Sequence, residues 1–139
     1  MKRKSTEIFK RIVAIVFVAI VACQIAFAAY SKQGTFKLKG NDQPWTNTTT
    51  SGTRLTQRKM SDSGFYLVKA TAKTMSSTPK FCIIGTDNVI YSKMVDLQEV
   101  NHEYRGVNTA QKYWYMSASL KASVFQYGDD TISVKFDPK

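Results

Sequence analysis

Short segments in which apolar and polar side chains alternate recur along this chain after residue 34, and they constrain the fold more than any other feature. Thr35–Lys39 alternates apolar and basic residues, as a strand with one buried face and one wet face would. Gln111–Leu120 repeats the pattern over a longer stretch. It predicts a core-facing set of Trp114, Met116, Ala118 and Leu120, and a solvent-facing set of Tyr113, Tyr115, Ser117 and Ser119. The chain is therefore expected to be built from strands.

Further strands follow from apolar, β-branched or aromatic runs bounded by turn residues. The expected strands are Thr53–Lys59, charged as an edge strand often is, then Phe65–Lys73, Lys80–Gly85, Val89–Val95, and a closing hairpin of 123–127 with Thr131–Phe136. Asp96–Arg105 fits either one or two helical turns or an irregular strand. About seven or eight short strands at this spacing predict an all-β fold, an antiparallel β-sandwich or a small barrel.

The first 28 residues differ in character from the rest. Met1–Arg11 is rich in Lys and Arg, and the 18 residues of Ile12–Ala29 carry no charge. A basic segment, an apolar segment and the small-x-small sequence Ala26-Phe27-Ala28 are the parts of a secretory signal. The sequence therefore predicts a helical signal peptide over 1–28, removed by cleavage after Ala28, and a single secreted β domain over 29–139.

Two alternatives to cleavage remain open. The apolar run is just long enough to cross a bilayer as an uncleaved anchor. Ile20-Val21-Ala22-Cys23 is a loose lipidation sequence, although the residues after Cys23 stay mostly apolar. In all three cases the basic N-terminal segment stays on the cytoplasmic side, which places the folded part outside the cytoplasm. We therefore expect a secreted or outward-facing protein.

Charge gives a first indication of partners. The formal net charge is +10, but the first 28 residues hold five basic groups and one acid, which leaves +6 on the domain. Arg54, Arg58 and Lys59 lie close together in its first third, and such a cluster favours an anionic cell-wall or membrane polymer. The alternative is an ordinary soluble surface. No nucleic-acid-binding motif is present, and export argues against nucleic acid as a partner.

Candidates for catalysis are few. Cys82 is the single cysteine after residue 28 and lies in the apolar run Phe81-Cys82-Ile83-Ile84, which predicts a buried thiol rather than a nucleophile. Glu99 and Glu103 would share a face if their segment were helical, but a solvated pair is the simpler interpretation. With one histidine, His102, the sequence predicts no enzyme, no cofactor and no metal site.

Tyr113 and Tyr115 form the most suggestive pair. Two tyrosines on the solvent side of one strand make a flat aromatic platform that suits a sugar ring, a partner chain or a second copy of this protein. The alternative is that a second sheet covers them. Together with the basic cluster, they give a predicted contact surface of Tyr113, Tyr115, Arg54, Arg58 and Lys59.

Several short motifs between Tyr30 and Pro138 are arranged as in one class of proteins. Tyr30 follows the signal, Gln57-Arg58-Lys59 ends a basic strand, Asp62-Ser63 precedes an aromatic strand, and Phe136-Asp137-Pro138 lies near the C-terminus. In this layout the chain is similar to small secreted β-proteins of Gram-positive bacteria. The resemblance implies a secreted sandwich and provides no catalytic residues.

These observations predict an exported, non-enzymatic protein that acts by surface contact at the cell envelope or in an extracellular assembly. The alternative is a secreted, bacteriocin-like antagonist that acts on the envelope of a competitor.

Overall fold

The described part of the chain consists almost entirely of strands and their connections. The computed structural model describes Ile8, Lys10, 29–40, 44–123 and 128–139. Its strands are β1 (Gly34–Leu38), β2 (Thr56–Arg58), β3 (Phe65–Lys73), β4 (Lys80–Gly85), β5 (Val95–Asp96), β6 (Glu103–Val107), β7 (Tyr115–Lys121) and β8 (Asp130–Asp137). The predicted signal helix lies outside the described residues, except for Ile8 and Lys10. Within the described ranges, no helix is long and apolar enough to cross a membrane.

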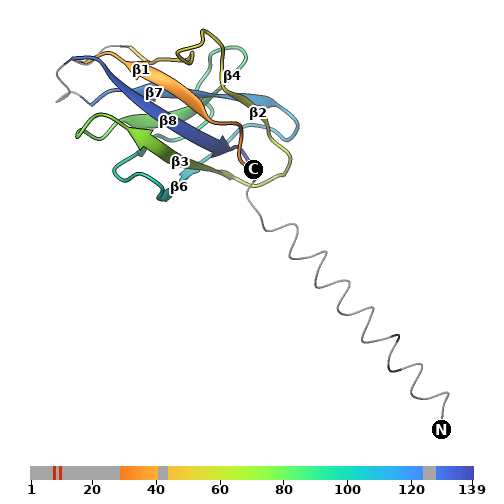
Figure 1. Ribbon diagram of the computed structural model, residues 1–139. Helices are drawn as coiled ribbons and strands as arrows, with labels where there is room; N and C mark the ends of the chain where they lie inside the picture. Colours follow the sequence, from red (N-terminus) through yellow and green to blue (C-terminus); the bar gives the residue numbers. More distant parts are fainter. Residues whose placement is uncertain (1–7, 9, 11–28, 41–43, 124–127) are drawn as a thin grey trace.

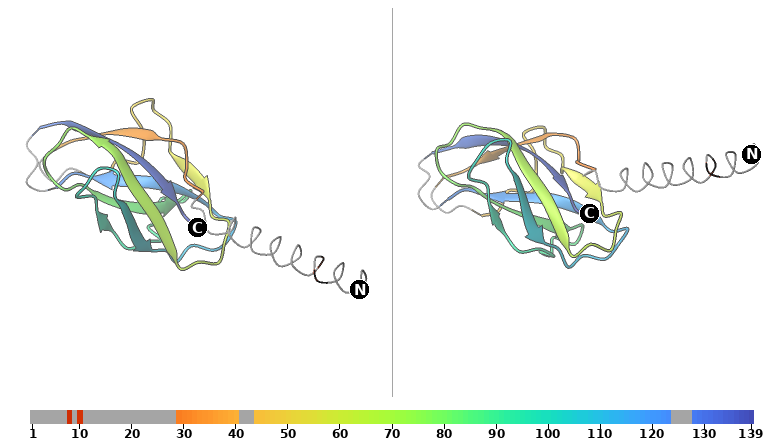
Figure 2. Two further views of the ribbon diagram at one scale, coloured as in Figure 1. Left: turned by 60° about the horizontal axis from the view of Figure 1, so that its bottom comes forward. Right: turned by 90° about the horizontal axis from the view of Figure 1, so that it is seen from below.

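The strands form two antiparallel sheets of four strands each. The first sheet has the order β1-β8-β3-β6 and the second the order β2-β7-β4-β5 (Figure 1). Figure 2 shows from two further sides that the two sheets lie face to face. The prediction of an antiparallel β-sandwich is thereby confirmed.

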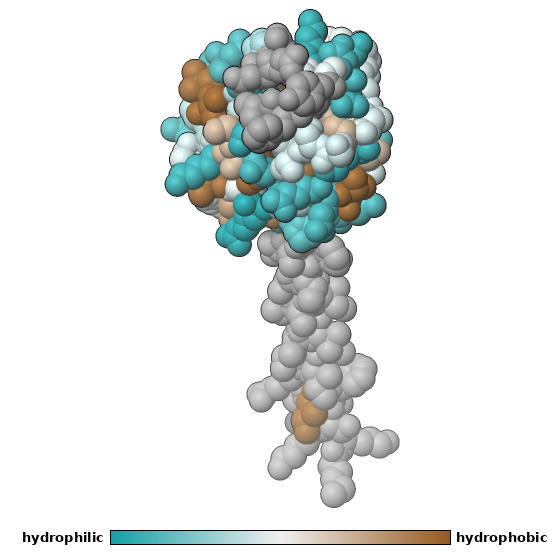
Figure 3. Space-filling model, turned by 90° about the vertical axis from the view of Figure 1, so that its left-hand side faces the viewer, coloured by the Kyte–Doolittle hydropathy of each residue, from teal (hydrophilic) through white to brown (hydrophobic). Residues whose placement is uncertain are grey.

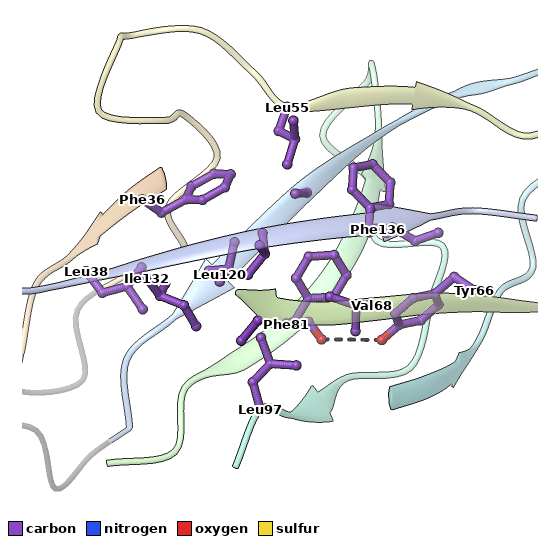
Figure 4. Close-up of a cluster of buried hydrophobic side chains, with 14 of the residues drawn as sticks. Phe36, Leu38, Leu55, Tyr66, Val68, Phe81, Leu97, Leu120, Ile132 and Phe136 are labelled. Carbon is purple, nitrogen blue, oxygen red and sulfur yellow. Dashed lines mark hydrogen bonds between the residues drawn. The ribbon is translucent and has the colours of Figure 1, made fainter. Parts of the chain in front are cut away.

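The core lies between the two sheets. Each sheet turns large side chains inward, and those without measurable exposure include Phe36, Tyr66, Phe81, Leu120 and Phe136 (Figure 4). The Phe81 ring packs against Tyr66 and Phe136, with centroids 5.6 and 5.9 Å away. Among the described residues, all strands and all of these core side chains come from residues 34–137. Figure 3 shows one end of the sandwich, where hydrophilic residues predominate.

Alternation in the sequence predicts correctly those strands that have one buried and one exposed face. Phe36 and Leu38 are buried and Lys37 is exposed on β1, and β2 lies at the edge of its sheet as its charges predicted. The second strand of the predicted closing hairpin, Thr131–Phe136, lies on β8, which pairs with β1 and β3. Residues 124–127 of that predicted hairpin lie outside the described residues.

The predicted strand Val89–Val95 is mostly irregular. Only Val95–Asp96 is a regular strand, and Ile90 and Ser92 make isolated bridges. A turn closed by a hydrogen bond from Asn88 N to Gly85 O precedes it. The Ser92 hydroxyl then accepts the Ile83 amide hydrogen at 2.9 Å, so a side chain replaces the main-chain partner of a regular ladder.

The ambiguous segment Asp96–Arg105 is not helical. It begins at the end of β5 and runs through a loop into β6. Glu99 lies in the loop and Glu103 on the strand, and both are exposed. The two carboxylates therefore do not form a dyad on a helix. Both are solvated, as the simpler interpretation predicts.

Candidate functional site

Tyr113 and Tyr115, the two predicted platform tyrosines, are both exposed, by 52% and 56%. Arg58 on β2 lies against both: its Cζ is 5.0 Å from the ring centroid of Tyr113 and 5.8 Å from that of Tyr115. Its Nε also donates to the main-chain oxygen of Tyr113 at 3.2 Å. The structure thus brings together three of the five residues of the predicted contact surface.

Trp114 corrects the sequence analysis. It was predicted to face the core, yet it is 40% exposed. Tyr113 has φ +71°, in the left-handed region, so the extended alternation does not reach back past Tyr115. The Trp114 ring instead meets Tyr91 edge to face, with centroids 5.3 Å apart and planes at 78°.

The opposite error occurs further along β7. Ser117 and Ser119, predicted to face solvent, are buried. The Ser117 hydroxyl hydrogen-bonds that of Thr56 at 2.9 Å, and the Ser119 hydroxyl donates to Asn47 Oδ1 at 2.6 Å. Thr46 bridges to Leu120, so the chain around residues 46 and 47 lies beside the end of this strand and brings Asn47 to Ser119, while Tyr115 at the beginning of the strand stays exposed.

At that open beginning the aromatic side chains line a pocket of about 320 Å³, which we call the aromatic pocket. Its lining residues come from two separate stretches of chain: Gly85, Thr86, Asp87, Tyr91, Tyr113, Trp114 and Tyr115. Four of the seven are aromatic. Asp87 and Tyr91 were not predicted from the sequence, because they belong to a turn region far from Tyr113.

Asp87 gives this pocket a fixed negative charge. Its Oδ2 accepts a hydrogen bond from the Tyr91 hydroxyl at 2.7 Å, and its Oδ1 accepts one from the Val89 amide at 3.0 Å. These bonds favour the ionised form and lower the pKa of the Asp87 carboxyl. The hydrogen bond between Tyr91 and Asp87 also raises the pKa of the Tyr91 hydroxyl. Asp87 is therefore a carboxylate at neutral pH.

Gly85 leaves room for the Asp87 carboxylate and the Tyr91 ring. A Cβ on Gly85 would lie 2.5 Å from Asp87 Oδ1 and 2.8 Å from Tyr91 Cε2. Such distances are shorter than any real contact, so a larger residue would push the carboxylate and the ring apart.

Cationic side chains stand around the pocket. Arg54 Nη2 donates to Asn88 Oδ1 in the turn that carries Asp87. Lys112 Nζ lies 5.1 Å from the Tyr113 ring centroid and 3.6 Å from Asp62 Oδ2. With Arg58, they make a basic rim around an aromatic and acidic interior.

Lys59, the fifth residue of the predicted surface, lies elsewhere. It is only 1% exposed, and its Nζ donates to the main-chain oxygens of Ser63 and Lys139. Burial lowers the pKa of its ammonium group. Because two main-chain oxygens satisfy this buried cation, Lys59 stabilises the fold and is not part of an exposed contact face.

A second pocket of about 520 Å³ lies beside β1 and β2. Hydroxyl groups of Thr49, Thr50, Ser51 and Thr53 line it together with Lys32 and Arg54, and it contains no aromatic side chain. Arg54 therefore lies between the two pockets. The aromatic pocket is the better candidate site because it combines apolar faces with a charged hydrogen-bond acceptor.

The structure does not bring the weak catalytic candidates together. Cys82 is buried on β4, and burial raises its pKa to about 11. The His102 ring packs on Tyr104 near β6, in the other sheet. Within the described ranges, no three His, Cys, Asp or Glu residues are grouped so as to hold a metal ion.

The buried position of Cys82 leads to a prediction about its reactivity. The native thiol should react with a disulfide reagent at least about 100-fold more slowly than the thiol of the same chain in denaturant, because the thiolate is scarce and covered. The denatured chain provides the reference rate in a stopped-flow measurement. Equal rates in both states would show that Cys82 is accessible.

Known proteins resemble this chain only weakly. No protein-family model matches the sequence, and no curated protein matches it significantly. Among solved structures, one similar chain is the EclA C-terminal domain, a sugar-binding protein (14% identity, 77% of this chain and 78% of that chain, TM-score 0.35). Another belongs to the acid-stable capsid of Helicobacter pylori bacteriophage KHP30 (13%, 81% and 92%, TM-score 0.34). A third is a carbohydrate-binding module from Cellvibrio mixtus lichenase 5A in complex with cellotriose (11%, 81% and 89%, TM-score 0.38). At these identities and TM-scores, the three proteins identify neither a family nor a ligand for this chain.

Proposed function

We propose that this chain is an exported, non-enzymatic contact protein that binds carbohydrate through the aromatic pocket. The observation that carries the proposal is the exposure of Tyr113, Trp114 and Tyr115 around a pocket that also holds Tyr91 and an ionised Asp87. Export rests on the signal-like sequence of residues 1–28.

The chemistry of the pocket suits a sugar better than it suits a reaction. A pyranose has an apolar face of C–H groups that packs flat on an aromatic ring, and a rim of hydroxyl groups that donate hydrogen bonds. Asp87 offers a charged acceptor for such hydroxyls, which makes stronger bonds than a neutral one. The pocket volume is at the small end of the range for ligand sites, about 300–1,000 Å³.

The charges indicate which sugars fit. A uronic acid placed in the pocket would bring a second carboxylate close to Asp87, and two like charges at short range repel. We therefore expect a neutral or amino sugar in the pocket itself. The rim of Arg54, Arg58 and Lys112 would attract acidic groups elsewhere on the same polymer from a longer distance.

The proposal is tested by retention of residues 29–139 on insoluble polysaccharides at low and high salt. Cellulose and chitin provide neutral and N-acetylated amino sugars, a purified bacterial wall provides a mixed polymer, and cross-linked pectate provides uronic acids. Retention on a neutral or amino-sugar polymer that survives 0.5 M salt, and that soluble oligosaccharides compete away, is the expected result. Retention on none of them, or on pectate alone and at low salt alone, would overturn the proposal.

The basic rim should affect the approach to the polymer rather than the fit of the sugar. Arg54→Gln should weaken retention on the bacterial wall about two- to fivefold at low salt, and should have no effect at 0.5 M salt, where exposed charges are screened. Lys39→Gln is the matched control, since Lys39 is an exposed cation at the end of β1 in the other sheet. An equal effect of both substitutions would show that net charge alone matters, and not the rim.

A further inference from the structure

The first described residues of the domain are fixed to the end of the last strand. The Ala29 amide donates to Asp137 Oδ2 at 2.8 Å, and Ala29 O accepts from Gln57 Nε2 at 3.1 Å. Ser31 continues the contact through its amide to Phe136 O at 2.8 Å and through its hydroxyl, which accepts the Phe136 amide hydrogen at 3.1 Å. Residues 29–31 therefore belong to the folded domain.

Asp137 is a buried carboxylate at this point. It is 5% exposed, its Oδ1 accepts the Lys139 amide hydrogen at 2.8 Å, and its Oδ2 lies 3.7 Å from Lys139 Nζ. A pocket of about 320 Å³ adjoins it, lined by Ala29, Met60, Ser61, Ser63, Phe65, Asp137 and Lys139. The carboxylate thus faces Ala29 N, with free space beside it.

We propose that Asp137 receives the new N-terminus when the chain is cut between Ala28 and Ala29. In that step a signal peptidase adds water across the peptide bond: the C–N bond breaks, Ala28 gains the hydroxyl oxygen as a carboxylate, and Ala29 gains an amine. The amine takes up a proton at neutral pH. A charged ammonium group then stands where an amide N–H donates to Asp137 in the uncut chain, and the hydrogen bond becomes an ion pair.

The position of this pair makes it effective. A carboxylate that is only 5% exposed gains more from a full positive charge than from an amide dipole, because water solvates it poorly on its own. Four other charged or titratable groups lie near the Asp137 carboxylate: Lys139, Lys59, Tyr30 and Glu103. Two of them already have other partners, because Lys59 Nζ donates to Lys139 O and the Tyr30 hydroxyl donates to Glu103. Processing would thus stabilise the domain in addition to releasing it.

The pH dependence follows from the sign of the effect. Pairing with Asp137 raises the pKa of the Ala29 amino group above its unfolded value of about 7.7–8.0. The added stability is therefore complete below that value and is lost as the pH rises through the higher folded pKa. An uncut chain has no such group and lacks this dependence.

The experiment compares one protein before and after removal of a cleavable N-terminal fusion that leaves Ala29 as the first residue. At pH 6.5, removal should raise the melting temperature by about 3–6 °C, and at pH 10.5 the difference should shrink towards zero. Asp137→Asn should abolish the difference at both pH values. Asp96→Asn, at an exposed carboxylate on β5, should leave it unchanged.

Several results would overturn the proposal: no rise on removal, a rise that is the same at both pH values, or a rise that persists in Asp137→Asn. If Asp137→Asn does not fold, the pKa of the Ala29 amino group in the wild-type chain decides between the two outcomes. That pKa is measured by an NMR titration after ¹³C-methylation of the amino group. A value clearly above 8 supports the pair, and a value of 8 or below contradicts it. None of these measurements involves the aromatic pocket, so their outcome is independent of carbohydrate binding.

Discussion

Replacing Gly106 by alanine should destabilise the domain by about 3 kcal/mol or more, the largest effect on stability that we expect from a single methyl group. Gly106 on β6 lies directly opposite Tyr66 on β3 in the ladder. A Cβ at Gly106 would lie 2.3 Å from Cε1 and Cζ of the Tyr66 ring. The ring has no room to retreat, since it is fully buried against Phe81 and its hydroxyl donates to Lys93 O at 2.8 Å.

Urea denaturation of the two proteins measures this difference, and Gly64→Ala is the matched control. A Cβ at Gly64 would meet no atom within 4 Å, so that variant should stay within about 0.5 kcal/mol of the wild type. The double variant Gly106→Ala, Tyr66→Leu should lose less stability than the two single changes add up to, because the clash disappears with the ring. Equal stability of both glycine variants would contradict the packing described here.

Removing Tyr113 and Trp114 together should weaken carbohydrate binding by about 30-fold or more, as truncation of central aromatic anchors does at other interfaces. The useful variant is Tyr113→Gly with Trp114→Ala. Tyr113 holds φ +71°, a conformation that costs a non-glycine residue about 1 kcal/mol and that glycine adopts freely. The change at position 113 should therefore remove the ring without unfolding the turn.

Isothermal titration with the best oligosaccharide measures the loss, and urea denaturation checks that the fold persists. Val107→Ala provides the control, because Val107 is an exposed apolar residue on β6 in the other sheet. The loss should be the same at low and high salt, since stacking is not screened. Undiminished binding by the double variant would remove the aromatic pocket from consideration.

Local alternation predicted most of the strands because a half-buried strand shows its two faces within a few residues. Phe36, Leu38 and Met116 follow this rule closely. The rule failed where one residue changes the backbone direction: the positive φ of Tyr113 turns Trp114 outward. It also failed at Ser119, which the distant residue Asn47 covers.

The pocket was only partly predictable for a related reason. Tyr113 and Tyr115 could be predicted because they are two residues apart in the sequence, whereas Asp87 and Tyr91 join them only through the pairing of β4 with β7. Lys59 was assigned to the surface because lysine is usually exposed, yet its partner Lys139 is 80 residues away. Contacts at such separations leave no local signal in a single sequence.

The short strand β2 gives the molecule a mechanical property. Gln57 holds Ala29, Arg58 bonds Tyr113 O, and the main chain of Lys59 pairs with Tyr113 and Trp114 at 2.7 and 2.9 Å. If the chain were held at its N-terminal side while the pocket gripped an immobile polymer, β2 would share the tension with the bonds that join Ala29 and Ser31 to β8. The short strand therefore links the anchored end of the domain directly to its pocket.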